Sequence, residues 1–278
     1  MSRLHPYLPQ HSLSRLMGWF ARRRFGSITT GAIRWFIRRY GVDMQESLIE
    51  DPSAYPSFNL FFTRALKPHA RPIASQPTAV VSPVDGNISE IGRLSSDKIL
   101  QAKGHFYSAA NLLGGNTELA RIFQNGHFLT AYLAPRNYHR IHMPIKGRLR
   151  QMIYIPGRLF SVNPKSVHSI AGLFARNERV VCLFDTDVGL MAVILVGAMI
   201  VGSISTVWHG RVTPPHQRKI SVWNYSEKNI SLERGAELGF FELGSTVILL
   251  FPENKIEWLT TLQANSPLRF GEMIGKMT

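Results

Sequence analysis

The chain has 278 residues, 45% of them hydrophobic, and is therefore long enough to bury a substantial core in one or two domains. Its formal net charge of +14 points to an anionic partner surface, either nucleic acid or anionic lipid. The single cysteine, Cys182, excludes an intrachain disulfide and any metal site built from several cysteines, and it indicates a reducing compartment.

The first 40 residues carry eight arginines and no acidic residue. Apolar residues recur there at helical spacing in two stretches, 13–20 and 33–40, with arginines between them and Trp19 and Trp35 nearby. This pattern predicts two amphipathic helices that lie in a membrane interface, and we assign residues 1–50 to a basic membrane-association arm. Two surface helices with a solvated basic face are the alternative. Nucleic acid is disfavoured because no recognised binding motif accompanies the arginines.

The longest apolar run, VGLMAVILVGAMIVGSI (188–204), has 17 residues, which is the lower limit for crossing a bilayer. It contains three glycines and many β-branched residues, so it predicts two buried strands joined near Gly197. We therefore expect no transmembrane helix. The N-terminus also lacks the apolar core and cleavage site of a secretory signal.

After a proline-containing stretch at 51–56, short apolar segments alternate with turns up to the C-terminus. This alternation of apolar segments and turns predicts an α+β fold whose β-rich, mainly antiparallel catalytic domain spans residues 51–278. Cys182 lies inside the strand-like run RVVCLFD, where it is expected to pack rather than react. The segment FELGSTVILLF (241–251) predicts a turn at Gly244-Ser245 followed by a buried strand.

Three short pieces carry groups that could do chemistry: Asp85 in SPVDG, His139 and His142 in YHRIHMP, and Ser245 after Gly244. A carboxylate can orient an imidazole, which in turn can activate a hydroxyl, so Asp85, His142 and Ser245 form a candidate relay. The serine hydrolase elbow G-x-S-x-G is absent, which disfavours an ordinary serine hydrolase. The two histidines lack a third ligand at a familiar spacing, so we expect no metal.

These pieces together resemble the phosphatidylserine decarboxylases of bacterial type, which are self-processing pyruvoyl enzymes. The hallmark of that family is a Gly-Ser-[Ser/Thr] site near the C-terminus, read here as Leu243-Gly244-Ser245-Thr246. The resemblance covers nearly the whole chain, and its other segments are FNLFFTRALKPHARPI (58–73), SPVDG (82–86), YHRIHMP (138–144), PGRLFSVNP (156–164), the GAMIVGSI run and the basic arm.

The resemblance implies that Asp85, His142 and Ser245 are the self-cleavage relay and that the bond broken is Gly244–Ser245. Cleavage would give fragments 1–244 and 245–278 and convert Ser245 into a pyruvoyl group, so that the cofactor is covalent pyruvate. The pyruvoyl ketone would form a Schiff base with phosphatidylserine and yield phosphatidylethanolamine and CO2, which makes the protein a lyase of phospholipid biosynthesis. His139 is implied in the decarboxylation step.

The expected partners are phosphatidylserine, an anionic membrane surface and the two fragments themselves, which stay associated because VILLF belongs to the core. A homodimer is left open, and nucleic acid is not expected. We predict a peripheral protein on the cytoplasmic side of the cell membrane. Three other functions stay open at this point: a pyruvoyl decarboxylase of a soluble amine, a non-enzymatic binder of anionic lipid or nucleic acid, and a serine hydrolase.

Overall fold

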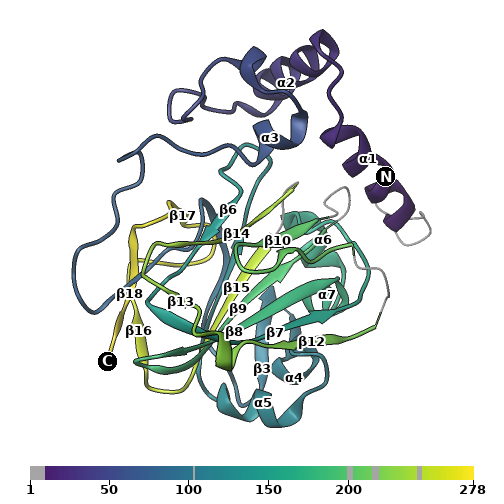
Figure 1. The fold of residues 1–278 in the computed structure, drawn as a ribbon. Coiled ribbons are helices and arrows are strands. Elements are labelled where there is room, and N and C mark those ends of the chain that lie inside the picture. Colours follow the sequence, from purple (N-terminus) through teal and green to yellow (C-terminus); the bar gives the residue numbers. More distant parts are fainter. Residues whose placement is uncertain (1–9, 103, 199–202, 215–218, 243–245) are drawn as a thin grey trace.

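The structure is a computed structural model that describes residues 10–102, 104–198, 203–214, 219–242 and 246–278. In these parts of the chain strands predominate, and every ladder between them is antiparallel. Short helices lie against the sheets, and longer helices form the N-terminal arm (Figure 1). The prediction of an α+β fold with a mainly antiparallel, β-rich domain is confirmed.

The largest sheet of the described chain has nine strands. Eight of them lie side by side in the order β12 (Ser221–Asn224), β7 (Gly147–Ile155), β8 (Arg179–Thr186), β9 (Gly189–Val196), β15 (Thr246–Phe251), β5 (His127–Tyr132), β2 (Gly86–Arg93) and β17 (Pro267–Leu268), and β13 (Ser231–Leu232) pairs with β7. The centre of this sheet is therefore built by β9, β15 and β5, from three distant parts of the chain.

Two smaller sheets pack against one face of the large sheet. The first has the order β11 (Gly210–Arg211), β10 (Ile204–Thr206), β14 (Glu237–Phe241) and β6 (Arg140–His142), and the second has the order β1 (Ala79–Val81), β18 (Met273–Met277) and β16 (Ile256–Trp258). Residues from all three sheets, including Leu249, Phe241 and Ile274, form one buried apolar cluster. The main core thus lies between the sheets.

The opposite face of the large sheet is covered by a hairpin and short helices. These elements are β3 (Lys98–Ala102), β4 (His105–Ser108), α4 (Ala109–Leu112), α5 (Thr117–Ile122), α6 (Pro164–Ser169) and α7 (Leu173–Arg176). Because both faces of the sheet are buried, neighbours such as Val193 and Ile194 pack into different clusters. Cys182 is buried in β8 and packs in the first of these clusters, as predicted.

Burial on both faces also explains the apolar run 188–204. A strand that is covered on both sides reads as a continuous hydrophobic segment rather than an alternating one. The first half of the run forms the buried strand β9, as predicted, and its last residue, Ile204, begins β10 of another sheet. Residues 199–202 lie outside the described residues, so the second strand and the join near Gly197 stay a prediction. In the described part of the chain no helix combines the length and hydropathy needed to cross a bilayer.

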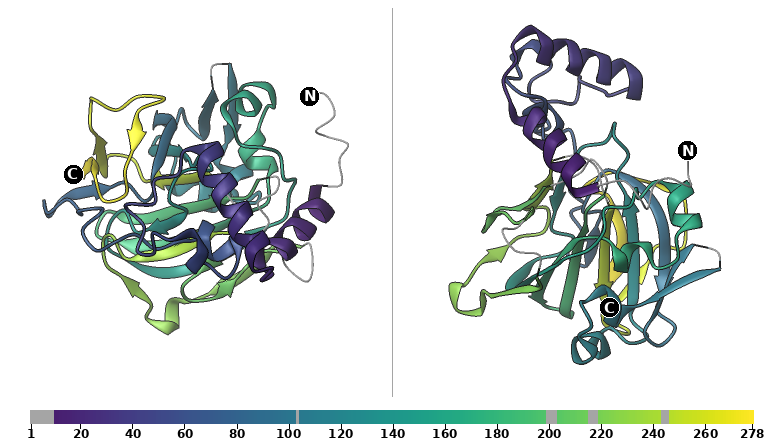
Figure 2. Two further views of the ribbon diagram at one scale, coloured as in Figure 1. Left: turned by 90° about the horizontal axis from the view of Figure 1, so that it is seen from above. Right: turned by 90° about the vertical axis from the view of Figure 1, so that its right-hand side faces the viewer.

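The N-terminal region forms α1 (Gln10–Arg22) and α2 (Ser27–Tyr40), followed by a 3-10 turn at Pro52–Ala54 and by α3 (Phe58–Phe62). Figures 1 and 2 show α1 and α2 at one end of the β-rich domain. Both helices lie where the periodicity predicted them. Ile33 and Phe36 of α2 pack with Phe61 and Phe62 of α3, so a small core ties the arm to residues beyond 50. The division at residue 50 stays a prediction.

Candidate active site

The segment YHRIHMP contains the strand β6, which lies beside β14, the strand that leads toward Gly244 and Ser245. His142 is opposite Glu237, and Arg140 is opposite Phe240. The ladder continues past the strand, because the amide of Phe241 donates to the carbonyl of His139 at 3.1 Å. The pairing therefore places His139 beside the end of β14 from which the chain continues. Gly244 and Ser245 themselves lie outside the described residues.

His142 is buried, and both of its ring nitrogens have partners. Nδ1 lies 2.9 Å from the carbonyl oxygen of Gly235, and Nε2 lies 2.9 Å from the hydroxyl of Tyr138. A carbonyl oxygen can only accept, so Nδ1 carries the proton and Nε2 accepts from Tyr138. Burial lowers the pKa of His142 to about 4, against the opposing effects of the Gly235 carbonyl and Asp85. The ring is therefore neutral at pH 7, with its basic nitrogen directed at a hydroxyl.

Asp85 lies in the turn between β1 and β2, and its carboxylate is fully engaged. Arg71 donates to it through Nε at 3.0 Å and through Nη2 at 2.6 Å, and the amide of Phe270 donates at 2.8 Å. The same Nη2 of Arg71 contacts Glu46, and this hydrogen bond lowers the pKa of Glu46. Gly86, the next residue, permits the close approach of β2 to β5, because a Cβ there would lie 2.3 Å from the carbonyl oxygen of Tyr132.

Phe270 links Asp85 to His142. Its amide binds Asp85, and its ring stacks on the imidazole of His142 with centroids 3.6 Å apart and planes at 15°. No hydrogen bond joins Asp85 to His142 in the described arrangement; each has other partners. The structure thus brings two members of the predicted relay to one place without connecting them directly, and their role in self-cleavage stays a prediction.

His139 is completely buried beneath α3. Its ring stacks on Phe62 with centroids 4.0 Å apart, and Nε2 lies 3.4 Å from the carbonyl oxygen of Pro135. Its Nδ1 has no hydrogen-bond partner among the described residues. Burial, and next the positive charge of Arg64, lower the pKa of His139 to about 3. A buried ring nitrogen without a partner among the described residues is uncommon in folded proteins.

Several neighbours of these side chains were not identified from the sequence. Arg71 and Tyr138 lie inside segments that carry the resemblance, so their position beside Asp85 and His142 had a sequence signal. No sequence signal indicated Phe270, because it approaches His142 from the C-terminal part of the chain and is 128 residues away in the sequence.

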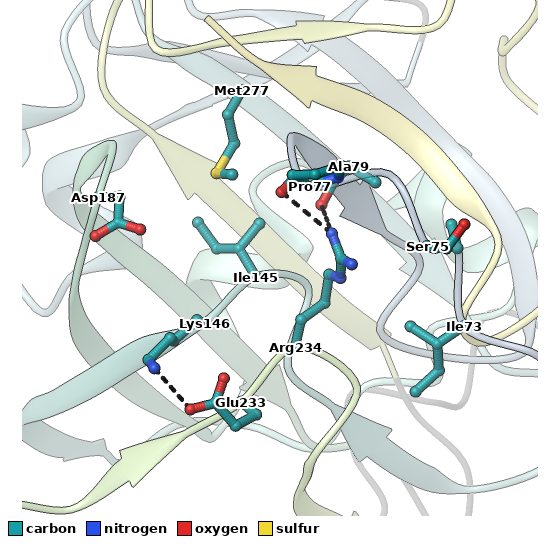
Figure 3. A pocket seen from close by; sticks show the side chains of 11 residues that line it. Ile73, Ser75, Pro77, Ala79, Ile145, Lys146, Asp187, Glu233, Arg234 and Met277 are labelled. Atoms are coloured by element: carbon teal, nitrogen blue, oxygen red, sulfur yellow. Dashed lines mark hydrogen bonds and ion pairs between the residues drawn. The ribbon is translucent and has the colours of Figure 1, made fainter.

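Two cavities of the described chain differ in their position relative to these side chains. A cavity of about 160 Å³ is lined by Asp85, Arg71, Tyr138 and Arg64, among others, and so adjoins the site. A larger one, of about 480 Å³, has an apolar wall that includes Ile145 and polar groups that include Arg234 (Figure 3). The larger cavity is lined by none of Asp85, His139 and His142.

Known proteins are similar to this chain over almost its whole length. The family model described as phosphatidylserine decarboxylase matches residues 58–276, and a second one, described as PSD, matches residues 3–41. A protein of Coxiella burnetii (strain RSA 493 / Nine Mile phase I) is 56% identical over 278 residues, which is 100% of this chain and 98% of the relative.

Two further relatives are similar to this chain over most of its length. One from Delftia acidovorans (strain DSM 14801 / SPH-1) is 60% identical over 88% of this chain and 86% of its own. One from Pseudomonas aeruginosa (strain LESB58) is 56% identical over 96% of this chain and 93% of its own. All three are named phosphatidylserine decarboxylase proenzyme. The matched family model and the full-length relatives show that this chain belongs to the phosphatidylserine decarboxylase family.

Proposed function

We propose that this chain is a proenzyme that cleaves itself between Gly244 and Ser245 and then converts phosphatidylserine into phosphatidylethanolamine and CO2. Family membership over the full length supports the overall reaction. The observation that supports the assignment of residues is the pairing of β6 with β14, which places His139 beside the end that leads toward Gly244 and His142 opposite Glu237, at the start of β14. Cleavage gives fragments 1–244 and 245–278.

Self-cleavage needs a base, and His142 is neutral at pH 7 and has its proton on Nδ1. Its Nε2 accepts the proton of the Ser245 hydroxyl once Tyr138 has turned away. The oxygen then bonds to the carbonyl carbon of Gly244, the C–N bond breaks, and the released amine takes up a proton. Asp85 lies close enough to act on the charge of His142 and stabilises the imidazolium that forms.

The resulting ester is resolved by elimination. Loss of the α proton of Ser245 expels the carboxylate of Gly244 and leaves dehydroalanine, which tautomerises to an imine. Addition of water and loss of ammonia then leave a pyruvoyl group at the start of the small fragment. Water thus enters at the imine, after the peptide bond has already been broken.

The pyruvoyl ketone supplies an electron sink conjugated to the substrate amine, which the carbanion left by CO2 requires. We assign His139 to this protonation: it lies beside the end of β14, and its neutral ring leaves Nδ1 without a partner among the described residues, so Nδ1 can first accept a proton and then pass it to that carbon. The residues near the cleavage point fit such a group, because Thr246 begins a strand that is completely buried and excludes water.

The arm supports a membrane-bound substrate. On α2, the side chains of Ile28 and Trp35 are 73% and 61% exposed, and Arg34, Arg38 and Arg39 lie on the same helix. Apolar groups beside arginines favour an anionic bilayer surface, so we infer peripheral attachment to the cytoplasmic side of the cell membrane. Sedimentation with vesicles is expected when they contain phosphatidylserine and to weaken with salt. Equal sedimentation with phosphatidylcholine vesicles would contradict an electrostatic contribution.

A denaturing gel with mass spectrometry tests the cleavage. The wild-type chain should give fragments 1–244 and 245–278, the smaller one blocked by pyruvate at its N-terminus. Ser245→Ala should give one intact chain without decarboxylase activity, because the attacking hydroxyl is gone. Ser169→Ala, which removes an exposed hydroxyl on α6, should be cleaved normally. Wild-type protein that stays intact and still decarboxylates would disprove the proposal.

A further inference from the structure

Glu242 is the last described residue before Gly244 and Ser245, and its carboxylate is held by two arginines. Its side chain is only 7% exposed. Arg22 donates to Oε2 through Nη1 at 2.8 Å, and Arg211 donates to Oε1 through Nη2 at 3.1 Å and through Nε at 3.2 Å. Both oxygens of a nearly buried carboxylate are therefore paired, which is the condition under which such a charge is tolerated.

The two arginines come from separate parts of the fold. Arg211 ends β11, the edge strand of the sheet that contains β14. Arg22 lies 220 residues away from Glu242 in the chain, at the last position of α1. Gly18, one turn earlier, gives its guanidinium space, because a Cβ there would lie 3.2 Å from Nη1 of Arg22.

The backbone on both sides of the cleavage segment is also anchored. The amide of Glu242 donates to the carbonyl of Ser203 at 3.0 Å, which extends the ladder of β10 and β14. Thr246 pairs with Tyr132 on one side and with Val196 on the other. Only residues 243–245 separate these two anchored residues in the sequence.

We propose that Glu242 is a positioning residue for self-cleavage and that Arg22 makes this positioning depend on α1. The inference rests on the proposed cleavage at Gly244–Ser245. The ion pairs set the end of β14, and through it the carbonyl of Gly244 that Ser245 attacks. Because Arg22 belongs to the arm, α1 must be seated on the catalytic domain for the bond to be held in its reactive geometry.

The effect on the rate of self-cleavage is measurable, because a small displacement of the reacting groups slows a reaction strongly. A misplacement of about 1 Å costs up to roughly a hundredfold in rate, so Glu242→Gln and Arg22→Gln are each expected to slow cleavage about 10- to 100-fold. Arg22→Lys keeps the charge and should restore most of the rate. The double variant should be no slower than Glu242→Gln alone, because both changes remove the same contact.

The experiment follows the conversion of full-length precursor, made by cell-free translation, into its two fragments over time. Melting temperatures of the variants are measured in parallel, with Arg121→Gln, an exposed arginine on α5, as the control for loss of a charge. The proposal requires slower cleavage in variants whose melting temperature is close to that of the wild type.

Cleavage of Glu242→Gln and Arg22→Gln at the wild-type rate would overturn the inference and leave the proposed function standing. Additive slowing in the double variant would also overturn it, since the two residues would then act separately. If Glu242→Gln does not fold, Arg22→Gln, which removes a side chain that is 32% exposed, decides alone. A wild-type chain that never cleaves would overturn the proposed function and this inference together.

Discussion

His139 and His142 are three residues apart, yet their rings face different surroundings. His142 contacts the carbonyl of Gly235 and the hydroxyl of Tyr138, whereas His139 keeps a ring nitrogen without a described partner. Burial holds the pKa of both well below the usual value for histidine. Both rings are therefore neutral over the physiological pH range and able to accept a proton.

The pKa of His142 predicts how self-cleavage depends on pH. A base with a pKa of about 4 stays unprotonated down to about pH 5, so the first-order cleavage rate should be constant from pH 8 to about pH 5 and fall below that. A histidine with an ordinary pKa of about 6.5 would instead halve the rate near that pH. Time courses of precursor cleavage in buffers of different pH distinguish the two. A midpoint near pH 6.5 would contradict the base assigned here.

The same pKa values have a consequence for stability. Unfolding returns both histidines to a pKa of about 6.5, so the unfolded chain binds more protons at pH values between 6.5 and the lower pKa of each folded histidine. Their contribution to stability is therefore complete above pH 6.5 and is lost progressively as the pH falls toward about 4 for His142 and about 3 for His139. Cleavage rates below pH 5 should accordingly be compared only after the melting temperature has been measured.

At the scale of elements, the position of β14 depends on how closely it approaches β10. Gly239 of β14 is paired with Thr206, and a Cβ at Gly239 would lie 2.1 Å from the backbone carbonyl oxygen of Ser205. Backbone atoms of a central ladder cannot move aside as the end of a flexible side chain can. The glycine is therefore required for β14 to lie between β10 and β6.

Gly239→Ala should destabilise the protein by about 1–3 kcal/mol, because the added methyl group must push two paired strands apart. Gly31→Ala is the matched control: no atom lies within 4 Å of a Cβ at this position in α2, so it should stabilise the helix by up to about 1 kcal/mol. Melting curves of the two variants should shift in opposite directions. A Gly239→Ala variant as stable as the wild type would show that β14 tolerates a wider spacing.

At the scale of the whole molecule, the predicted cleavage divides the chain inside its core. The small fragment contains β15, which lies between β5 and β9 in the large sheet, and also β18, which lies between β1 and β16. All six residues of β15 are buried, and each large apolar side chain among them contributes about 1.5–3 kcal/mol by its burial. Most contacts of the small fragment are therefore with the large one.

Fragments 1–244 and 245–278 should consequently elute as one species in size-exclusion chromatography under native conditions. Denaturant should separate them in the same step in which the sheet unfolds, because β15 cannot leave without breaking two ladders. Mass spectrometry of the eluted peak identifies both pieces. A small fragment that is lost from the native protein would contradict the role of β15 as a central strand of the mature form.

The sequence by itself determined the features that depend on local pattern. The helices of the arm followed from apolar residues at helical spacing, and the strands around Cys182 and in 246–251 followed from short apolar runs between turns. The family followed from motifs such as LGST and YHRIHMP, which specify chemistry through a few consecutive residues. The roles of Asp85, His142 and Ser245 in self-cleavage stay predictions.

The tertiary structure alone decided which distant residues meet. It placed Arg71 on Asp85, the ring of Phe270 on His142, and Arg22 of the arm on Glu242. None of these contacts has a periodicity or spacing that a sequence could display, because each joins segments brought together only when the sheets pack. The local pattern therefore predicts which groups react, whereas long-range packing sets the protonation and the partners of the two histidines and the position of the strand that leads to the predicted cleavage bond.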